Sequence, residues 1–187
     1  PGMAQGKLLT SPYPSALINY IDASRARNLH GVYGVLTGDR LTGIDPYFGA
    51  DIKDRPIVGM ERVRFQGEPV AIVAATDLET AEAALGLIEV GYEELPPLTN
   101  VFAALEPDAP LLHKSNICHE AGYAWGDVER DFAEADYVFE DTFTFPMVYH
   151  YALEPHVCIA RFDANGLAVW SSAQHPFFML PKYLPTI

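Results

Sequence analysis

The sequence predicts an α+β fold, with a mixed domain first and the strands of a second domain after it. Residues 70–75 are apolar at every position, which is typical of a strand buried on both faces. Apolar residues at helical spacing follow directly, and another strand pattern comes after them. Three long strand patterns then lie between 137 and 172. A chain of 187 residues is long enough to bury a core without disulfide or metal support.

The first part of the chain alternates short strands with turns. Residues 6–10 form a short apolar run that two prolines close with a turn, and strands are expected at 16–21 and 31–37. Asp22 follows the first of these strands and is the expected N-cap of one or two helical turns. The polar, Gly-containing stretch 38–55 predicts a long loop.

The strongest local pattern is a strand–helix–strand unit. Its three strands are expected at 63–65, 69–75 and 90–93. Thr76 and Glu79 have the spacing of a capping box, in which each side chain satisfies a free amide of the first helical turn. Four apolar residues then recur at helical spacing and are expected to face a core: Leu78, Ala81, Leu85 and Ile88.

A polar, aperiodic stretch at 113–126 predicts a linker, which places the two domains at 1–112 and 127–187. Short helices are expected on either side of it, within 101–112 and 127–136. The strands expected after them are 137–145, 151–162 and 167–172. Asn165-Gly166 separates the last two and is the favoured pair for a tight hairpin turn. The proline-containing end does not resemble the finish of a domain, so we expect the second domain to be incomplete and to leave a large apolar patch uncovered.

Acidic residues dominate the charge, with 25 Asp and Glu against 12 Lys and Arg and a net charge of −13. Nucleic acids and anionic membrane surfaces are bound through clustered Lys and Arg, so we expect neither as a partner. The apolar runs stay well below the roughly 20 residues that span a bilayer. Cys118 and Cys158 form no C-x-x-C motif, which excludes zinc ribbons and thioredoxin-type sites. We expect two reduced, partly buried thiols in a cytoplasmic protein, with a disulfide between them as the alternative.

Common catalytic motifs are absent from the sequence, including Gly-rich phosphate loops, G-x-S-x-G and H-E-x-x-H. His150, Glu154 and His156 alternate, so on a strand they would share a face on which a divalent metal could bind. Pro155 interrupts that strand, however. A hydrogen-bonded polar layer is therefore the preferred interpretation, and no metal ligand is predicted.

Seven phrases of the sequence carry a family resemblance in their order and spacing. They are KLLTSPYPSALI (7–18), LHGVYGVLT (29–37), VRFQGEPVAIVA (63–74), IEVGYEELP (88–96), ADYVFE (135–140), HYALEP (150–155) and WSSAQHP (170–176). Together they resemble the N-terminal portion of the large, molybdenum-binding subunit of the xanthine dehydrogenase / aldehyde oxidase / carbon monoxide dehydrogenase family. The resemblance implies an α/β hammerhead domain over 1–112, followed by the first strands of a molybdenum-cofactor-binding domain.

The resemblance also implies an activity. Members of this family hydroxylate a C–H carbon of an aldehyde or an N-heteroaromatic ring with oxygen from water. Their molybdenum is held by a pyranopterin (molybdopterin), and electrons leave through iron–sulfur clusters, usually to FAD. The implied partners are therefore the remainder of the molybdenum subunit, the iron–sulfur and FAD subunits, and a small-molecule substrate. The protein contributes orientation and electrostatics to such a cofactor.

The resemblance assigns site residues at two positions, and His150 or His156 is a possible partner of the second. Gln174 matches a glutamine that donates a hydrogen bond to an oxygen ligand of molybdenum, a contact suited to a neutral amide. Glu154 matches the Glu of a family Glu-Pro pair, and we interpret it as structural support for the site, with His150 as a neighbour. A carboxylate there needs partners if it is buried, so we expect Glu154 to be buried and hydrogen-bonded. Exposure of this side chain would remove it from the set of site residues.

The sequence also departs from the family pattern. Val148 stands where relatives often have glutamine, and Ala173 stands where threonine is common. The family's glycine-rich cofactor loop and essential glutamate base have no counterpart here, so no catalytic residue is predicted and the chain alone is expected to be inactive. Two hypotheses follow: part of a molybdenum hydroxylase large subunit, either a split subunit or a truncated chain, or a non-catalytic scaffold or assembly module with the hammerhead fold.

Overall fold

The computed structural model describes residues 2–49 and 52–174. The described residues up to Asn116 form one unit, which we call unit 1, and those from Ile117 form unit 2. The boundary between the units falls inside the expected linker.

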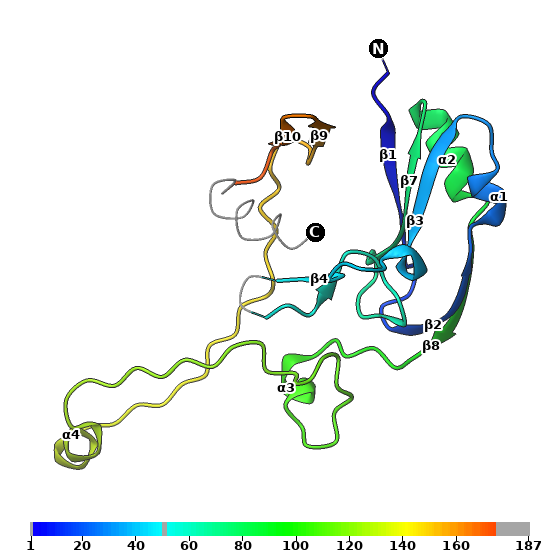
Figure 1. The fold of residues 1–187 in the computed structure, drawn as a ribbon. Coiled ribbons are helices and arrows are strands. Elements are labelled where there is room, and N and C mark those ends of the chain that lie inside the picture. The colour runs from blue at the N-terminus through cyan, green and yellow to red at the C-terminus, as the bar shows by residue number, and fades with distance from the viewer. Residues whose placement is uncertain (1, 50–51, 175–187) are drawn as a thin grey trace. The chain divides into compact units, whose positions relative to one another are not determined.

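Unit 1 contains a three-stranded antiparallel sheet with the order β1-β7-β3 (Figure 1). Its strands are β1 (Gln5–Thr10), β3 (Val32–Thr37) and β7 (Pro69–Ala75). The all-apolar strand β7 lies in the centre, with Val70, Ala71, Val73 and Ala75 fully buried. Strands β3 and β7 lie within one residue of where the sequence predicts strands, and β1 covers the short apolar run at 6–10.

A second antiparallel sheet has the order β6-β2-β8. Its strands are β2 (Ala16–Asp22), β6 (Arg62–Val63) and β8 (Glu89–Glu94). The predicted strand–helix–strand unit therefore links two sheets, since β7 and β8 belong to different ones. The expected long loop at 38–55 is only partly irregular: it holds a 3-10 turn, η1 (Gly38–Arg40), and a short strand pair, β4 (Tyr47–Phe48) with β5 (Arg55–Pro56).

Three short helices complete unit 1: α1 (Ser24–Arg27), α2 (Leu78–Leu85) and α3 (Val101–Ala104). The predicted capping box at Thr76 is wrong. Asp77 is the N-cap of α2, and its Oδ1 accepts the Thr80 amide at 2.8 Å. The Thr76 amide instead donates to the Gly31 carbonyl at 2.8 Å, so the backbone of this residue still belongs to the sheet.

The N-terminus of α1 differs from the prediction by one residue. Ala23 occupies the N-cap position, whereas the predicted cap, Asp22, accepts the Ser24 amide from one place earlier at 2.8 Å. The carboxylate therefore still satisfies a free amide at the start of this helix.

The main core of unit 1 lies between the sheet β1-β7-β3 and the helices α1 and α2. Alanines of both helices, Ala23, Ala26, Ala81 and Ala84, are buried there with residues of β3 and β7. Small side chains allow the helices to pack closely on the sheet. Leu78 departs from the predicted helical face, because it begins α2 and is 49% exposed. A smaller cluster joins Ala16, Val63 and Val70.

Unit 2 contains one helix, α4 (Val128–Glu134), and one hairpin, β9 (Cys158–Asp163) with β10 (Gly166–Ser171), among residues 117–174. Asp127 caps α4 by accepting the Arg130 amide at 3.1 Å. Gly166 pairs with Asp163 and begins β10 with φ at +107°, so the turn lies at 164–165, one residue earlier than predicted.

Two of the three strand predictions for unit 2 are wrong. Residues 137–145 form no strand, and the predicted strand 151–162 is present only from Cys158. A strand needs a hydrogen-bonded neighbour, and residues 117–174 supply one only to β9 and β10.

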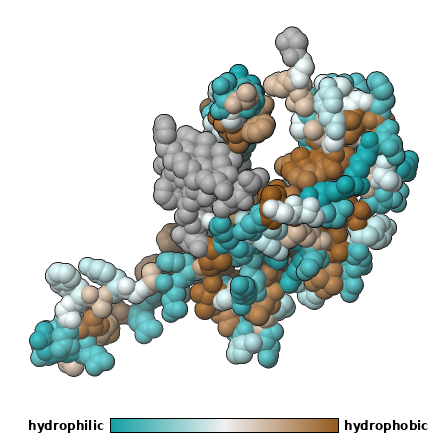
Figure 2. All heavy atoms as spheres, in the orientation of Figure 1, coloured by the Kyte–Doolittle hydropathy of each residue, from teal (hydrophilic) through white to brown (hydrophobic). Residues whose placement is uncertain are grey.

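Large apolar side chains of unit 2 are exposed, as expected, although most of the residues that carry them form no strand. Figure 2 shows hydrophobic residues at the surface around α4, and the strongly exposed side chains include Tyr123, Trp125, Phe139, Phe145 and Met147. Phe177, Phe178 and Leu180, which we expect from the sequence to extend this apolar patch, lie outside the described residues. Among the described residues, no helix has the length and apolar character needed to cross a membrane.

Candidate functional site

Gln174, the predicted cofactor-binding residue, follows the hairpin of unit 2. Pairing extends one residue beyond β10, because Ser172 and Val157 exchange backbone and side-chain hydrogen bonds at 3.1–3.2 Å. The Ala173 amide then donates to the Ser171 hydroxyl at 3.2 Å, which turns the chain out of the ladder. Gln174 comes next and is exposed. Its position just beyond the last paired residue leaves the amide available to a group outside the hairpin.

His150 and Glu154 lie in the irregular segment that precedes β9, and both are exposed. The expected burial of Glu154 is therefore wrong, and by the criterion stated above this residue leaves the set of site residues. The reason is structural: the residues around it form no strand, so nothing in unit 2 covers its carboxylate. No hydrogen bond or ion pair between described residues joins His150, Glu154 and Gln174 to one another.

The chemistry of these residues can be compared with the implied cofactor. A pyranopterin brings its own sulfur ligands to molybdenum, so the chain need not supply a metal-binding cluster. No group of three His, Cys, Asp or Glu side chains suited to a metal ion occurs within 2–49 and 52–174. An exposed neutral amide with two N–H donors fits a single contact to an oxygen atom of such a group. The residues present thus fit one contact of the cofactor.

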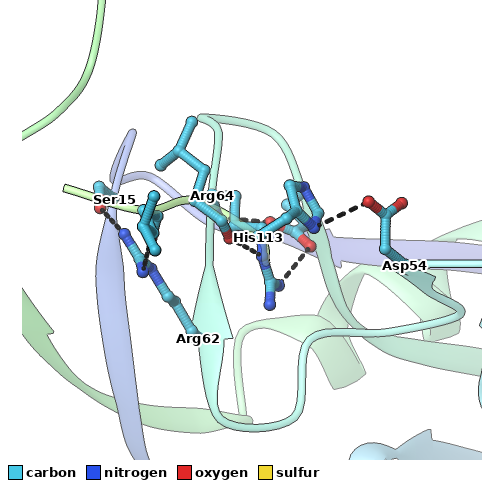
Figure 3. Close-up of polar contacts among 8 residues, drawn as sticks. Ser15, Asp54, Arg62, Arg64 and His113 are labelled. Carbon is cyan, nitrogen blue, oxygen red and sulfur yellow. Dashed lines mark hydrogen bonds and ion pairs between the residues drawn. The ribbon is translucent and has the colours of Figure 1, made fainter. Parts of the chain in front are cut away.

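A second polar centre lies in unit 1, and sequence analysis did not assign it (Figure 3). Strand β6 places Val63 in the core, where it is fully buried, so Arg62 and Arg64 on either side of it project to the opposite face. Arg62 Nη1 donates to the Leu111 carbonyl at 2.9 Å, and Arg64 Nε donates to the Leu112 carbonyl at 2.8 Å. The available signal was the Arg-Val-Arg alternation at the end of a strand.

Glu68 supports this centre from the turn after β6. Its side chain is only 3% exposed, and one carboxylate oxygen accepts the Arg64 amide at 2.5 Å. The other oxygen lies 3.9 Å from Arg64 Nη1. Gly67 closes the turn with φ at +93°, a conformation that glycine adopts without strain. The buried carboxylate is therefore satisfied by one guanidinium and one backbone amide.

The two arginines also border a cavity of about 180 Å³. The other residues that line it are Leu17, Tyr47, Pro56, Met60 and Glu61. Its wall combines apolar side chains with guanidinium groups whose donors already bind carbonyl oxygens. This arrangement holds backbone in place and contains no pairing of a nucleophile with a base.

Hydrogen bonds shift the pKa of three aspartates that hold turns and helix starts in unit 1. The Ser24 amide lowers the pKa of Asp22, the Thr37 hydroxyl lowers that of Asp39, and the Thr80 amide lowers that of Asp77. Burial raises the pKa of Tyr92, whose ring centroid lies 5.2 Å from that of Tyr13. All of these groups belong to the framework of the fold.

Comparison with known proteins relates both units to one family. Residues 1–96 match the family model "Aldehyde oxidase and xanthine dehydrogenase, a/b hammerhead domain". Residues 112–183 match the model "Molybdopterin cofactor-binding domain". The two matches follow one another in the order in which the sequence resemblance places the two domains.

Curated and solved relatives agree with these matches. The chain is 39% identical to a probable xanthine dehydrogenase polypeptide of Bacillus subtilis, over 95% of this chain and 24% of that protein. It is 36% identical to the "Carbon monoxide dehydrogenase large chain" of Afipia carboxidovorans, over 94% of this chain and 24% of that protein. The solved structure of a Cu,Mo-CO dehydrogenase matches with a TM-score of 0.80 at 36% identity, over 97% of this chain and 25% of that one.

The chain therefore spans about a quarter of the length of the relatives that it matches. The hammerhead match alone covers more than half of its residues, and the fold of the solved relative extends across both units. The chain belongs to the aldehyde oxidase and xanthine dehydrogenase family, with a hammerhead domain followed by the start of a molybdopterin-binding domain.

Proposed function

We propose that this chain acts as the N-terminal part of a large subunit that oxidises a small molecule. In this proposal the substrate is an aldehyde or an N-heteroaromatic compound whose C–H carbon receives oxygen from water. The observation that supports it best is the succession of a hammerhead match and a molybdopterin-domain match along one chain. The relative named for xanthine supports the N-heteroaromatic class. The chain is inactive without the segments that supply a catalytic base.

The residues of this chain orient and contact the cofactor. When bound, the molybdenum pyranopterin supplies the two-electron redox chemistry. The Gln174 amide donates a hydrogen bond to an oxygen atom of the cofactor from the end of the β9–β10 hairpin. A neutral donor suits this contact, because it fixes an oxygen without adding charge. Partner subunits carry the iron–sulfur clusters and FAD that remove the electrons.

The alternative function, a scaffold that has the hammerhead fold without the cofactor, is not favoured. Residues 112–183 match the molybdopterin-binding domain itself, in addition to the hammerhead match. Cys118 and Cys158 are free and exposed, so their expected partial burial is wrong. We further propose a cytoplasmic location, in which both thiols stay reduced.

Substrate oxidation in labelled water tests the proposed function. The chain is combined with the polypeptide that carries the remainder of its subunit and with the electron-transfer subunits, and aldehydes and N-heteroaromatic compounds are supplied in H₂¹⁸O. We expect product that carries ¹⁸O from the assembled complex and none from the chain alone. Turnover by the chain alone, or product whose added oxygen comes from O₂, would contradict the proposal.

A further inference from the structure

The last residues of unit 1 form no helix or strand after α3, yet hydrogen bonds hold them firmly. The Asn116 amide group donates to the carbonyls of Ala104 and Pro110 at 3.1 and 3.0 Å. Its oxygen accepts the Leu112 amide at 3.0 Å. One side chain thus closes residues 104–116 into a loop just before the chain leaves unit 1. We call residues 105–116 the exit segment.

Two arginines hold the exit segment from outside. The carbonyls of the consecutive residues Leu111 and Leu112 accept hydrogen bonds from Arg62 Nη1 and Arg64 Nε (Figure 3). These donors lie 49 and 48 positions earlier in the sequence, so the contacts join the exit segment to the second sheet. His113 adds a third attachment, because its Nδ1 lies 3.2 Å from Asp54 Oδ2.

The two arginines differ in how they are held. Arg64 is paired with the buried Glu68, as described above. Arg62 makes no ion pair within the described residues, and its Nε is buried without a hydrogen-bond partner there. Its terminal nitrogens instead bridge Ser15 Oγ, at 3.3 Å, and the Leu111 carbonyl. Burial of this unpaired donor costs stability. Because Arg62 also makes no ion pair there, its role is not to satisfy a nearby charge.

A guanidinium suits this bridging role. It is planar and presents several N–H donors in fixed directions, so one group reaches two acceptors that belong to different segments. A lysine at the same position offers a single ammonium with rotatable donors and does not fix the two acceptors relative to each other. Strand β6 is anchored in the core through Val63. Its backbone therefore fixes where both guanidinium groups lie, and these groups in turn hold the exit segment.

We propose that Arg62 and Arg64 are positioning residues, which fix the point where the chain leaves the hammerhead domain and so set where the molybdopterin-binding domain begins. Neither touches the reacting atoms. The functional part of this inference rests on the proposed function, because it concerns the placement of residues such as Gln174 relative to a cofactor. The structural part, ordering of the exit segment, stands independently of any activity.

Hydrogen exchange of the whole chain tests the structural part. Arg62→Ala removes the bridge, and we expect the amides of 105–116, Leu112 above all, to exchange about tenfold faster or more, with β7 unchanged. Arg62→Lys should restore this protection only partly. Arg25→Ala is the control, because Arg25 makes a surface ion pair with Glu89 at 3.6 Å. Wild-type exchange of the exit segment in Arg62→Ala would overturn the proposal.

The same variants in the assembled complex test the functional part. Arg62→Ala should keep its molybdenum and pterin, with a turnover number about tenfold lower and partial rescue in Arg62→Lys. Arg64 is tested in the same way with Arg64→Ala. If that variant does not fold, Arg64→Lys replaces it, because lysine keeps a positive charge near Glu68. Full turnover in Arg62→Ala overturns the positioning role. A wild-type complex without molybdenum contradicts the proposed function instead, and the hydrogen exchange of the exit segment then decides the structural part by itself.

Discussion

At the scale of single residues, aspartate carboxylates of unit 1 accept local hydrogen bonds at turns and helix starts, and we assign them no catalytic role. Asp77 begins α2 by accepting the Thr80 amide, and Asp22 and Asp39 accept local hydrogen bonds in the same way. Each bond favours the charged carboxylate, which lowers the pKa of all three. The sequence predicts a cap near Asp77 but assigns it to Thr76, because the bond from the Thr76 amide to Gly31 is set by tertiary structure.

Asp77 provides a test of this capping at the residue scale. Its folded-state pKa lies below the ordinary 3.8, so its contribution to stability is complete above that value and is lost as the pH falls through the lowered one. Asp77→Asn keeps a good cap without a titrating group. We expect stability close to wild type at pH 7 and a shallower loss on acidification in urea unfolding curves.

Asp77→Ala loses the cap and should be less stable than wild type at pH 7. Asp108→Asn, at an exposed position outside any helix start, is the matched control. Equal acid sensitivity of Asp77→Asn and wild type would show that this carboxylate does not contribute as described.

Gln174 provides the functional test at this scale. In the assembled complex, Gln174→Ala removes the proposed donor, and we expect turnover to fall by about 10- to 100-fold with the molybdenum retained. Gln66→Ala, in the exposed turn after β6, is the control and should turn over like wild type. Unchanged turnover together with an unchanged molybdenum EPR signal in Gln174→Ala would remove this residue from the site.

At the scale of elements, burial on both faces makes β7 the organising strand of unit 1. The sequence predicts its exact bounds, because an uninterrupted apolar run of this length is typical of a strand buried on both faces. The stretch 137–157 shows the opposite case. Its residues have strand-like patterns, but a pattern forms a strand only where a neighbour offers backbone hydrogen bonds. The Arg62–Arg64 centre escaped prediction for a similar reason, since its acceptors are backbone carbonyls, which no side-chain motif reveals.

The central position of β7 predicts a clear difference between two apolar residues of one sheet. Val73 is fully buried on β7, and Val73→Ala should lower the free energy of unfolding by about 2 kcal/mol. Leu8 on β1 is 51% exposed, so Leu8→Ala should cost about 0.5 kcal/mol or less. Urea unfolding monitored by circular dichroism measures both. Equal losses in the two variants would mean that β7 is not the core strand.

At the scale of the whole molecule, the two units differ in how much they bury. Both core clusters lie in unit 1, whereas none of residues 117–174 is buried. Residue patterns predict the order of the two domains, whereas the family resemblance supplied their identity, because the second domain shows few of its contacts within this chain. The exposed apolar side chains of residues 117–174 form no core of their own.

This difference predicts that unit 1 folds by itself. A fragment of residues 1–116 should unfold in one cooperative transition at the urea midpoint of the full chain. It should also bind far less of a hydrophobic dye such as ANS, because the exposed apolar residues of unit 2 are gone. A fragment that fails to fold, or that binds the dye as strongly as the full chain, would contradict the division described here.

The most direct test of the central claim is the molybdenum and pterin content of the complex that contains this chain. The complex is isolated through a tag on the chain, and molybdenum is measured by mass spectrometry and pterin by fluorescence after oxidation. Membership of a cofactor-binding large subunit predicts equimolar molybdenum and pterin per copy of the chain. A stable assembly that contains the complete subunit and lacks both would contradict it.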